Sequence, residues 1–191
     1  MRKFGLIFFS FIIVLSFSGC GNQTPKKQVD NELKAIKTRN IEDISDFNSI
    51  FSNEALSKKH EKSYKEAISK LQDFDYEIIS EEQDGSKGKV RVKIKTYNFG
   101  DAYKRTYDNI IAEVKSGKIT DKTKDLDIES RVYELLFQNM SKIKEKNFEK
   151  EITIYCKKNK KEEWETNIGD SLELQDAILG GLVSALNNKS K

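Results

Sequence analysis

The stretch Lys89-Val90-Arg91-Val92-Lys93-Ile94-Lys95-Thr96-Tyr97 decides the fold. Apolar and charged side chains alternate along it, which is typical of a β-strand with one buried and one solvated face. A shorter alternating run, 74–79, precedes it, and the turn sequence Asp84-Gly85-Ser86-Lys87-Gly88 lies between the two runs. The sequence therefore predicts an antiparallel hairpin.

The two faces of this hairpin have different expected roles. Apolar side chains share the inner face: Phe74, Tyr76, Ile78, Val90, Val92 and Ile94. On the outer face we expect a cross-strand charge ladder, with Asp75, Glu77 and Glu81 opposite Arg91, Lys93 and Lys95. Opposite charges in such a ladder attract each other across the strands. The alternative for the basic row is an anion-binding strip.

A second hairpin is predicted nearer the C-terminus. One strand carries Phe148, Ile152, Ile154 and Cys156 on one face, and the return strand carries Trp164, Thr166 and Ile168. Cys156 aligns with the apolar residues, so we expect a buried and unreactive thiol. The lysine-rich segment 157–161 is the predicted turn. Such a turn is usually solvated, and the alternative is a contact with an acidic wall polymer or an anionic lipid.

Helical spacing of apolar residues flanks both hairpins. It predicts helices within 29–51, 56–71, 103–114, 128–143 and 172–186. His60 lies on or beside an apolar face, where a structural role is expected. Asp125 or Asp127 is the expected N-cap of the fourth helix. Gly180-Gly181 falls inside the last helix, either because the backbone packs closely against the sheet or because that helix end is flexible.

Residues 1–19 have the pattern of an export signal. Met1-Arg2-Lys3 is positively charged, and the run from Phe4 to Phe17 is almost entirely apolar. A membrane span needs about 20 apolar residues, so this run has the length of a signal-peptide core instead. Phe17-Ser18-Gly19-Cys20 follows and resembles the lipobox of bacterial lipoproteins, with Phe17 where Leu is usual. The alternatives are an ordinary secretory signal before an incidental cysteine and an uncleaved signal anchor.

The lipobox resemblance implies that signal peptidase cuts before Cys20 and that the Cys20 sulfur carries a diacylglycerol. Two acyl chains hold a protein stably on a bilayer, so the expected location is the extracytoplasmic face of the bacterial cell membrane. Residues 20–28, which include the only proline, are expected to form the lipidated cysteine and a tether. Lys26 and Lys27 in this tether either touch anionic head groups or are solvated linker charges. Residues 29–188 are expected to form a single domain.

The composition disfavours several classes of function. Once Arg2 and Lys3 leave with the signal, bases and acids nearly balance, so we predict no nucleic-acid partner. One histidine and two cysteines disfavour zinc sites and Ser-His-Asp catalysis. The loop 121–129 has oxygen side chains at alternate positions, but Leu126 and Val132 stand where an EF-hand requires Gly and Glu. We therefore expect no metal, no cofactor and no catalytic residue.

The order of elements predicts an α+β fold, with a curved antiparallel sheet of about four strands, in two hairpins, packed against several helices. This order resembles cystatin-like and nuclear transport factor 2-like domains. Together with the lipobox, Trp164-x-x-x-Ile168 and Ala177-Ile178-Leu179-Gly180-Gly181-Leu182 resemble uncharacterised lipoproteins of low-GC Gram-positive bacteria. That family brings no established activity with it.

Two functional hypotheses follow. In the first, the domain is a noncatalytic surface module that binds an envelope protein, a cell-wall component or a small ligand. In the second, it is a small pocket enzyme of the dehydratase or isomerase kind. The residues expected to line such a pocket share the inward parity of the strands: Tyr76, Thr96, Trp164 and Thr166. The acid that shares this parity is Glu162.

Overall fold

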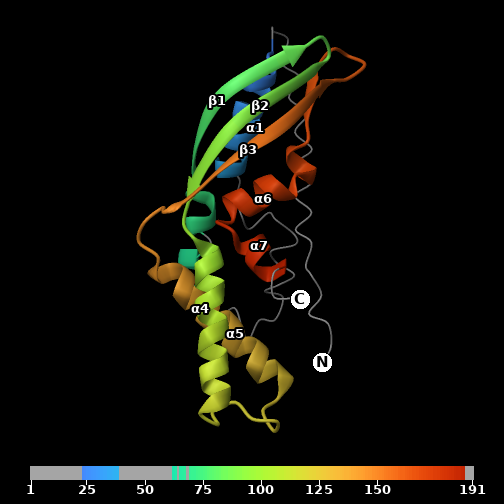
Figure 1. Ribbon diagram of the computed structural model, residues 1–191. Coiled ribbons are helices and arrows are strands. Elements are labelled where there is room, and N and C mark those ends of the chain that lie inside the picture. Colours follow the sequence, from blue (N-terminus) through green and yellow to red (C-terminus); the bar gives the residue numbers. More distant parts are fainter. Residues whose placement is uncertain (1–22, 39–61, 64, 68, 188–191) are drawn as a thin grey trace.

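A computed structural model of the protein describes residues 23–38, 62–63, 65–67 and 69–187. The fold is α+β, and its antiparallel sheet is open, with strand order β1-β2-β3-β4 (Figure 1). The strands are β1 (Asp75–Asp84), β2 (Lys87–Thr96), β3 (Phe148–Lys158) and β4 (Trp164–Thr166). Both predicted hairpins form, and β2 joins them by pairing with β3. The second turn lies beyond Lys158, slightly later than the predicted 157–161.

One face of the sheet is covered by two helices. α1 (Pro25–Thr38) and α6 (Leu172–Ile178) contribute apolar side chains to a common core with β2 and β3. The predicted inner face is confirmed: Phe74, Val90, Val92 and Ile94 are fully buried, and Tyr76 and Ile78 pack against the same core. Alternation of charged and apolar residues therefore determined which face of the sheet is buried.

The N-terminal boundary of the domain differs from the prediction. α1 begins at Pro25, inside the predicted tether, and Pro25 and Gln28 are buried. Proline is favoured in the first turn of a helix, because no partner is needed there for the missing N–H. The Pro25 ring packs on Gly88, where a Cβ would stand 2.6 Å from Pro25 Cγ. The single proline thus starts the helix and docks it on β2.

The charge ladder is confirmed in part: Asp75 pairs with Lys95 and Glu77 with Lys93 as predicted, whereas Glu81 does not face the basic row. A β-bulge between Ile78 and Ser80 shifts the register, so Glu81 pairs with Val90 and faces α1 instead of the outer row. There the Lys26 backbone N–H donates to Glu81 Oε1 at 2.9 Å. The basic row of β2 forms its ion pairs with β3: Arg91–Glu151 at 2.7 Å, Lys93–Glu149 at 2.7 Å and Lys95–Glu149 at 3.4 Å.

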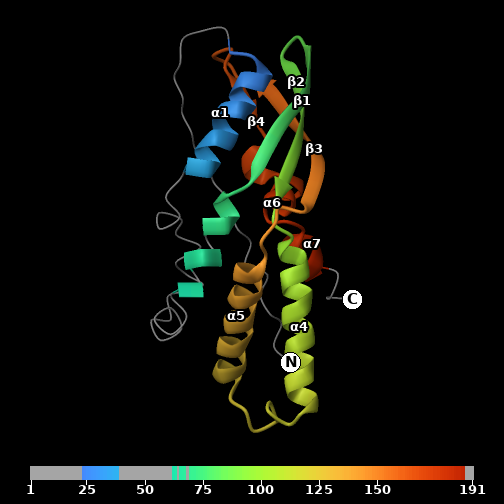
Figure 2. The same ribbon diagram turned by 90° about the vertical axis from the view of Figure 1, so that its left-hand side faces the viewer.

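A helical hairpin extends from the end of the sheet that lies opposite the β1–β2 and β3–β4 turns. It consists of α4 (Phe99–Lys115) and α5 (Asp125–Lys142), which run side by side (Figure 2). A second, smaller core lies at this end of the molecule, with Leu182 of the C-terminal segment packed against it: Ala67, Phe99, Ala102, Phe137, Met140 and Ile143. The N-cap of α5 is Lys124, without a side-chain cap, and not Asp125 or Asp127. Both aspartates lie in the first turn instead, where they interact favourably with the helix dipole.

The predicted C-terminal helix is broken at Gly180-Gly181. α6 ends at Ile178, and α7 (Leu182–Asn187) starts after the two glycines, which have φ values of +54° and +78°. Ser171 caps α6 by accepting from the Leu174 N–H at 3.2 Å. Gly180 packs against the backbone between β2 and α4, and its carbonyl accepts from the Gly100 N–H at 3.0 Å. Close backbone approach therefore explains Gly180, whereas at Gly181 a Cβ would stand 3.0 Å from the Phe148 ring in a backbone conformation that favours glycine.

Candidate functional site

The residues predicted to line a pocket under the sheet are in contact with other side chains of the domain. Trp164 and Thr96 are buried, and Thr166 is half-buried and donates to the buried Glu32 of α1. The other Glu32 oxygen accepts from Gln28 Nε2 at 2.7 Å. α1 and α6 fill the space beneath the strands with Val29, Leu33 and Leu174. The structure therefore does not bring the four predicted residues together around one cavity.

Thr96 and Trp164 have different surroundings within this interior. Thr96 is fully buried, and its hydroxyl finds no hydrogen-bond partner in the described part of the chain. Trp164 lies in β4 opposite Lys158, whose ammonium sits 5.6 Å from the indole centroid. This distance is within the usual range of a cation–π contact. The Lys158 side chain therefore covers one face of the Trp164 ring.

Tyr76 lines a surface hollow. The hollow has a volume of about 610 Å³ and lies between α1 and β1, lined by Thr24, Lys26, Lys27, Asp30, Tyr76 and Ile78. Tyr76 donates from its hydroxyl to Asp30 Oδ1 at 2.7 Å. Burial and this hydrogen bond raise the pKa of Tyr76. Although burial opposes it, the bonds from Lys34 and Tyr76 hold the pKa of Asp30 below its ordinary value.

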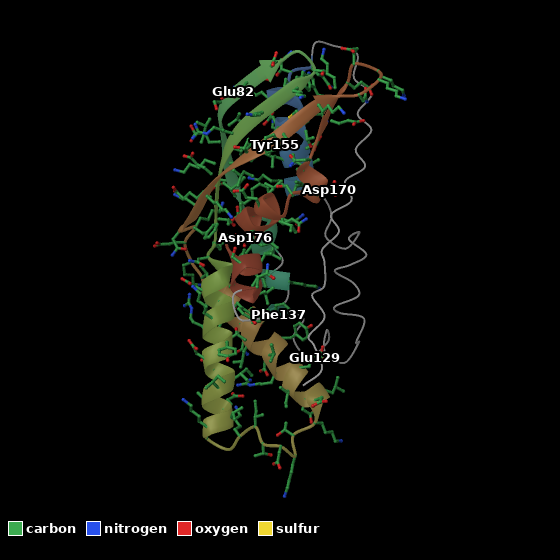
Figure 3. All side chains as sticks on the ribbon, turned by 45° about the vertical axis from the view of Figure 1, so that its right-hand side comes forward. Glu82, Glu129, Phe137, Tyr155, Asp170 and Asp176 are labelled. Carbon is green, nitrogen blue, oxygen red and sulfur yellow. The ribbon has the colours of Figure 1, made fainter. Side chains whose placement is uncertain are left out.

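Sequence reasoning missed the acids that lie near the inner face. Glu162, the acid of matching parity, is exposed in the turn at φ +63° and pairs with Lys158 at 3.0 Å. Glu32 and Asp176 are the buried ones. Asp176 lies on α6 (Figure 3), where it accepts from Lys150 at 3.1 Å and from the Ser184 N–H at 2.8 Å. Both acids belong to helices, so strand parity gave no signal for them.

The remaining predicted sites have simple outcomes. Cys156 is buried and free, and burial raises the pKa of its thiol to about 12. Within the described ranges, no three histidine, cysteine, aspartate or glutamate side chains are grouped as metal ligands. No described helix is both long and apolar enough for a bilayer. Cys20 and His60 lie outside the described residues.

The structure gathers lysines at one end of the molecule, which we call the lysine tip. Three segments meet there: the first turn of α1, the β1–β2 turn and the β3–β4 turn (Figures 1 and 2). The Lys158 N–H donates to the Ser86 carbonyl at 2.9 Å, which joins the two turns. The lysines of the tip are Lys26, Lys27, Lys87, Lys157, Lys158, Lys160 and Lys161.

Acids at the tip are mostly engaged within the domain. Glu81 caps α1, Glu162 pairs with Lys158, and Glu163 and Glu165 each accept from the Asn159 amide. The other acids near the tip are Glu82 and Asp84. Sequence analysis identified Lys26, Lys27 and the lysine-rich turn separately, and only the tertiary fold brings them together.

Comparison with known proteins gives no relative for this chain. No family model matches it, and neither a curated protein nor a solved structure is significantly similar.

Proposed function

We propose that the protein is an envelope lipoprotein with a noncatalytic recognition domain. In this proposal the chain is cut before Cys20, and the Cys20 sulfur carries a diacylglycerol on the extracytoplasmic face of the bacterial cell membrane. The domain then binds an envelope protein or a cell-wall component. The lipobox-like Phe17-Ser18-Gly19-Cys20, placed directly after a short apolar run, carries the anchoring half of the proposal.

The position of α1 supports a domain held close to the lipid. Because the helix starts at Pro25, only residues 21–24 separate it from Cys20. An extended chain covers at most about 3.5 Å per residue, so this link reaches roughly 14 Å. The domain would therefore rest against the head-group layer rather than extend into the wall.

The filled inner face carries the noncatalytic half of the proposal. A general acid or base needs to reach a substrate and to have a pKa near the working pH. Glu32 is instead engaged by Gln28 and Thr166 beneath α1. The pKa of Asp30, which does line the hollow, is lowered rather than raised. Recognition by an outer surface is the function that this arrangement favours.

We propose that the domain has a cystatin-like or nuclear transport factor 2-like fold. A helix before the sheet, α1, lies against one face of an antiparallel sheet, as expected for a cystatin-like or nuclear transport factor 2-like domain. The uncharacterised lipoproteins of low-GC Gram-positive bacteria are the family proposed for residues 20–186.

A small pocket enzyme is the second candidate, and the hollow beside α1 favours it. Its volume of about 610 Å³ falls in the ~300–1,000 Å³ range of small-molecule sites. Its Asp30–Tyr76 pair supplies a carboxylate and a phenol 2.7 Å apart. A dehydratase or isomerase reaction in this hollow would require Asp30, so Asp30→Asn would abolish turnover while leaving membrane attachment unchanged.

Mass spectrometry of the protein purified from its own envelope tests the anchor. We expect an N-terminal peptide that begins at Cys20 with an acylglyceryl adduct, and Cys20→Ala should leave the high-salt-washed membrane fraction. Cys156→Ala is the matched control, because it removes the only other cysteine and should stay in that fraction. An unmodified Cys20, or a Cys20→Ala protein that remains in the washed membrane, would overturn the proposal.

A further inference from the structure

We propose that the lysine tip is the membrane-facing surface of the domain and that it binds the phosphate groups of anionic phospholipids. This inference rests on the proposed function, since the lipid anchor would bring the tip to the bilayer. It adds a second contact, made by the folded domain itself, which fixes the orientation of the molecule. In this contact several lysines attract several lipid head groups electrostatically at the same time.

The first argument is the place where the chain leaves the domain. Pro25 packs on Gly88, beside the β1–β2 turn, and the adjacent Lys26 N–H bonds to Glu81 near the end of β1. The end of α1 that leads to Cys20 is therefore built into the tip. With a link of residues 21–24, a bilayer that holds Cys20 lies next to the tip lysines rather than next to α4 and α5.

The second argument is the charge pattern of the tip. Lys87 on β2 is the direct cross-strand partner of Lys157 on β3. An acid is the cross-strand partner on the other side of each lysine, Asp84 on β1 for Lys87 and Glu165 on β4 for Lys157, so this row is balanced in charge. Of the tip lysines, Lys158 pairs with Glu162, whereas Lys27, Lys160 and Lys161 are exposed and form no ion pair with any described residue. The exposed ammonium groups of Lys27, Lys160 and Lys161 are therefore the ones that a head-group layer would neutralise.

The third argument is the direction of the rest of the molecule. Glu82 lies near the tip, and Glu129 on α5 lies near the opposite end (Figure 3). When the tip faces the bilayer, α4 and α5 point away from it. The outer sheet face and the helical hairpin then remain open to a partner in the envelope.

Energy transfer from Trp164 to a dansyl head group in vesicles tests the orientation. Trp164 is the only tryptophan, and it lies in β4 opposite Lys158 at the base of the tip. The lipidated protein is reconstituted in phosphatidylcholine vesicles with or without phosphatidylglycerol. We expect phosphatidylglycerol to increase the transfer, and high salt to remove the increase, because salt screens exposed charges.

Two matched triple variants locate the effect. Lys27→Gln, Lys160→Gln and Lys161→Gln together should abolish the phosphatidylglycerol-dependent increase. Lys115→Gln, Lys122→Gln and Lys124→Gln together remove the same charge from the end near α4 and α5 and should leave the increase intact. Equal increases in both variants, or no increase in the unaltered protein, would overturn the inference while leaving the anchor standing.

The experiment also separates this inference from the proposed function. If the purified protein carries no acyl adduct, the anchor fails, and the same protein is sedimented with phosphatidylglycerol vesicles. The tip variant should then bind roughly a hundredfold more weakly than the control variant, since each of its three lysines contributes about 1 kcal/mol near the surface and about 1.4 kcal/mol is a factor of ten. Equal sedimentation overturns the tip. So does binding of soluble wall teichoic acid through the tip lysines without any response to phosphatidylglycerol.

Discussion

Gly180 lies directly against the backbone carbonyl of Tyr97, so that the position has no room for a Cβ atom. Its φ of +54° is also a conformation that side chains disfavour. The contact joins the link between α6 and α7 to the link between β2 and α4. It is a backbone-to-backbone contact between segments that lead into the two hydrophobic cores.

Gly180→Ala should lower the free energy of unfolding by about 3 kcal/mol. Roughly 1–2 kcal/mol comes from the left-handed backbone, and the remainder comes from displacing the Tyr97 backbone. Urea unfolding measures the loss. Gly85→Ala is the control, because Gly85 has a similar φ of +55° but a Cβ at that position would meet nothing within 4 Å. It should lose only ~1 kcal/mol, and equal losses would refute the close contact.

Tyr76→Ala should destabilise the domain by about 2 kcal/mol. The cost is smaller than the ~3–5 kcal/mol of a fully buried aromatic ring, because Tyr76 is only half-buried beside α1. Tyr155→Ala is the matched control on the outer face, where Tyr155 is 54% exposed. That change should stay within about 0.5 kcal/mol. If the two variants have the same midpoint of thermal unfolding, the assignment of the faces is wrong.

The Glu113–Arg131 pair should make stability depend on acid pH. Arg131 Nε donates to both Glu113 oxygens at 3.1 Å, linking α4 to α5, and the pair lowers the pKa of Glu113 to about 2. Because the folded-state pKa lies below the ordinary value of 4.5, the stabilisation is present above pH 4.5. It is lost as the pH falls toward 2.

Glu113→Gln should therefore cost about 1 kcal/mol near neutral pH, after allowance for solvent screening, and only a small part of that near pH 2, where Glu113 is half protonated in the folded protein. Glu129→Gln, an exposed acid on α5, is the control. Unfolding curves from pH 7 to pH 2 should converge for Glu113→Gln and the unaltered protein. A difference that stays constant over this range would contradict the ion pair.

Cys156 should resist thiol reagents until the protein unfolds. The thiolate is the reactive form, and the thiol is buried with a pKa of about 12. Titration with a chromogenic disulfide at mildly alkaline pH measures this. The native lipidated protein should show no reactive thiol, and the unfolded protein should show that of Cys156 alone. Release of a second thiol on unfolding would show that Cys20 carries no lipid.

Much of the candidate site could not be predicted from strand parity. The alternation in 89–97 correctly placed Val90, Val92 and Ile94 inside, because one buried face forces a period of two. The same rule failed at Glu81, since a bulge at Ile79 changes which residues share a face. It also missed Glu32, which α1 brings to Thr166 across a long stretch of sequence.

The sequence alone determined the elements whose signal is local: the two hairpins, the buried face of the sheet, the helices α4 and α5, and the lipobox-like segment before Gly21. Periodicity and turn residues act over a few positions, so they can be read without a fold. Only the tertiary structure decided that α1 fills the space predicted as a pocket, that Gly180-Gly181 breaks a helix and that Lys27 lies at the same end as Lys160 and Lys161. Those outcomes depend on which distant segments pack together, and local sequence does not encode that choice.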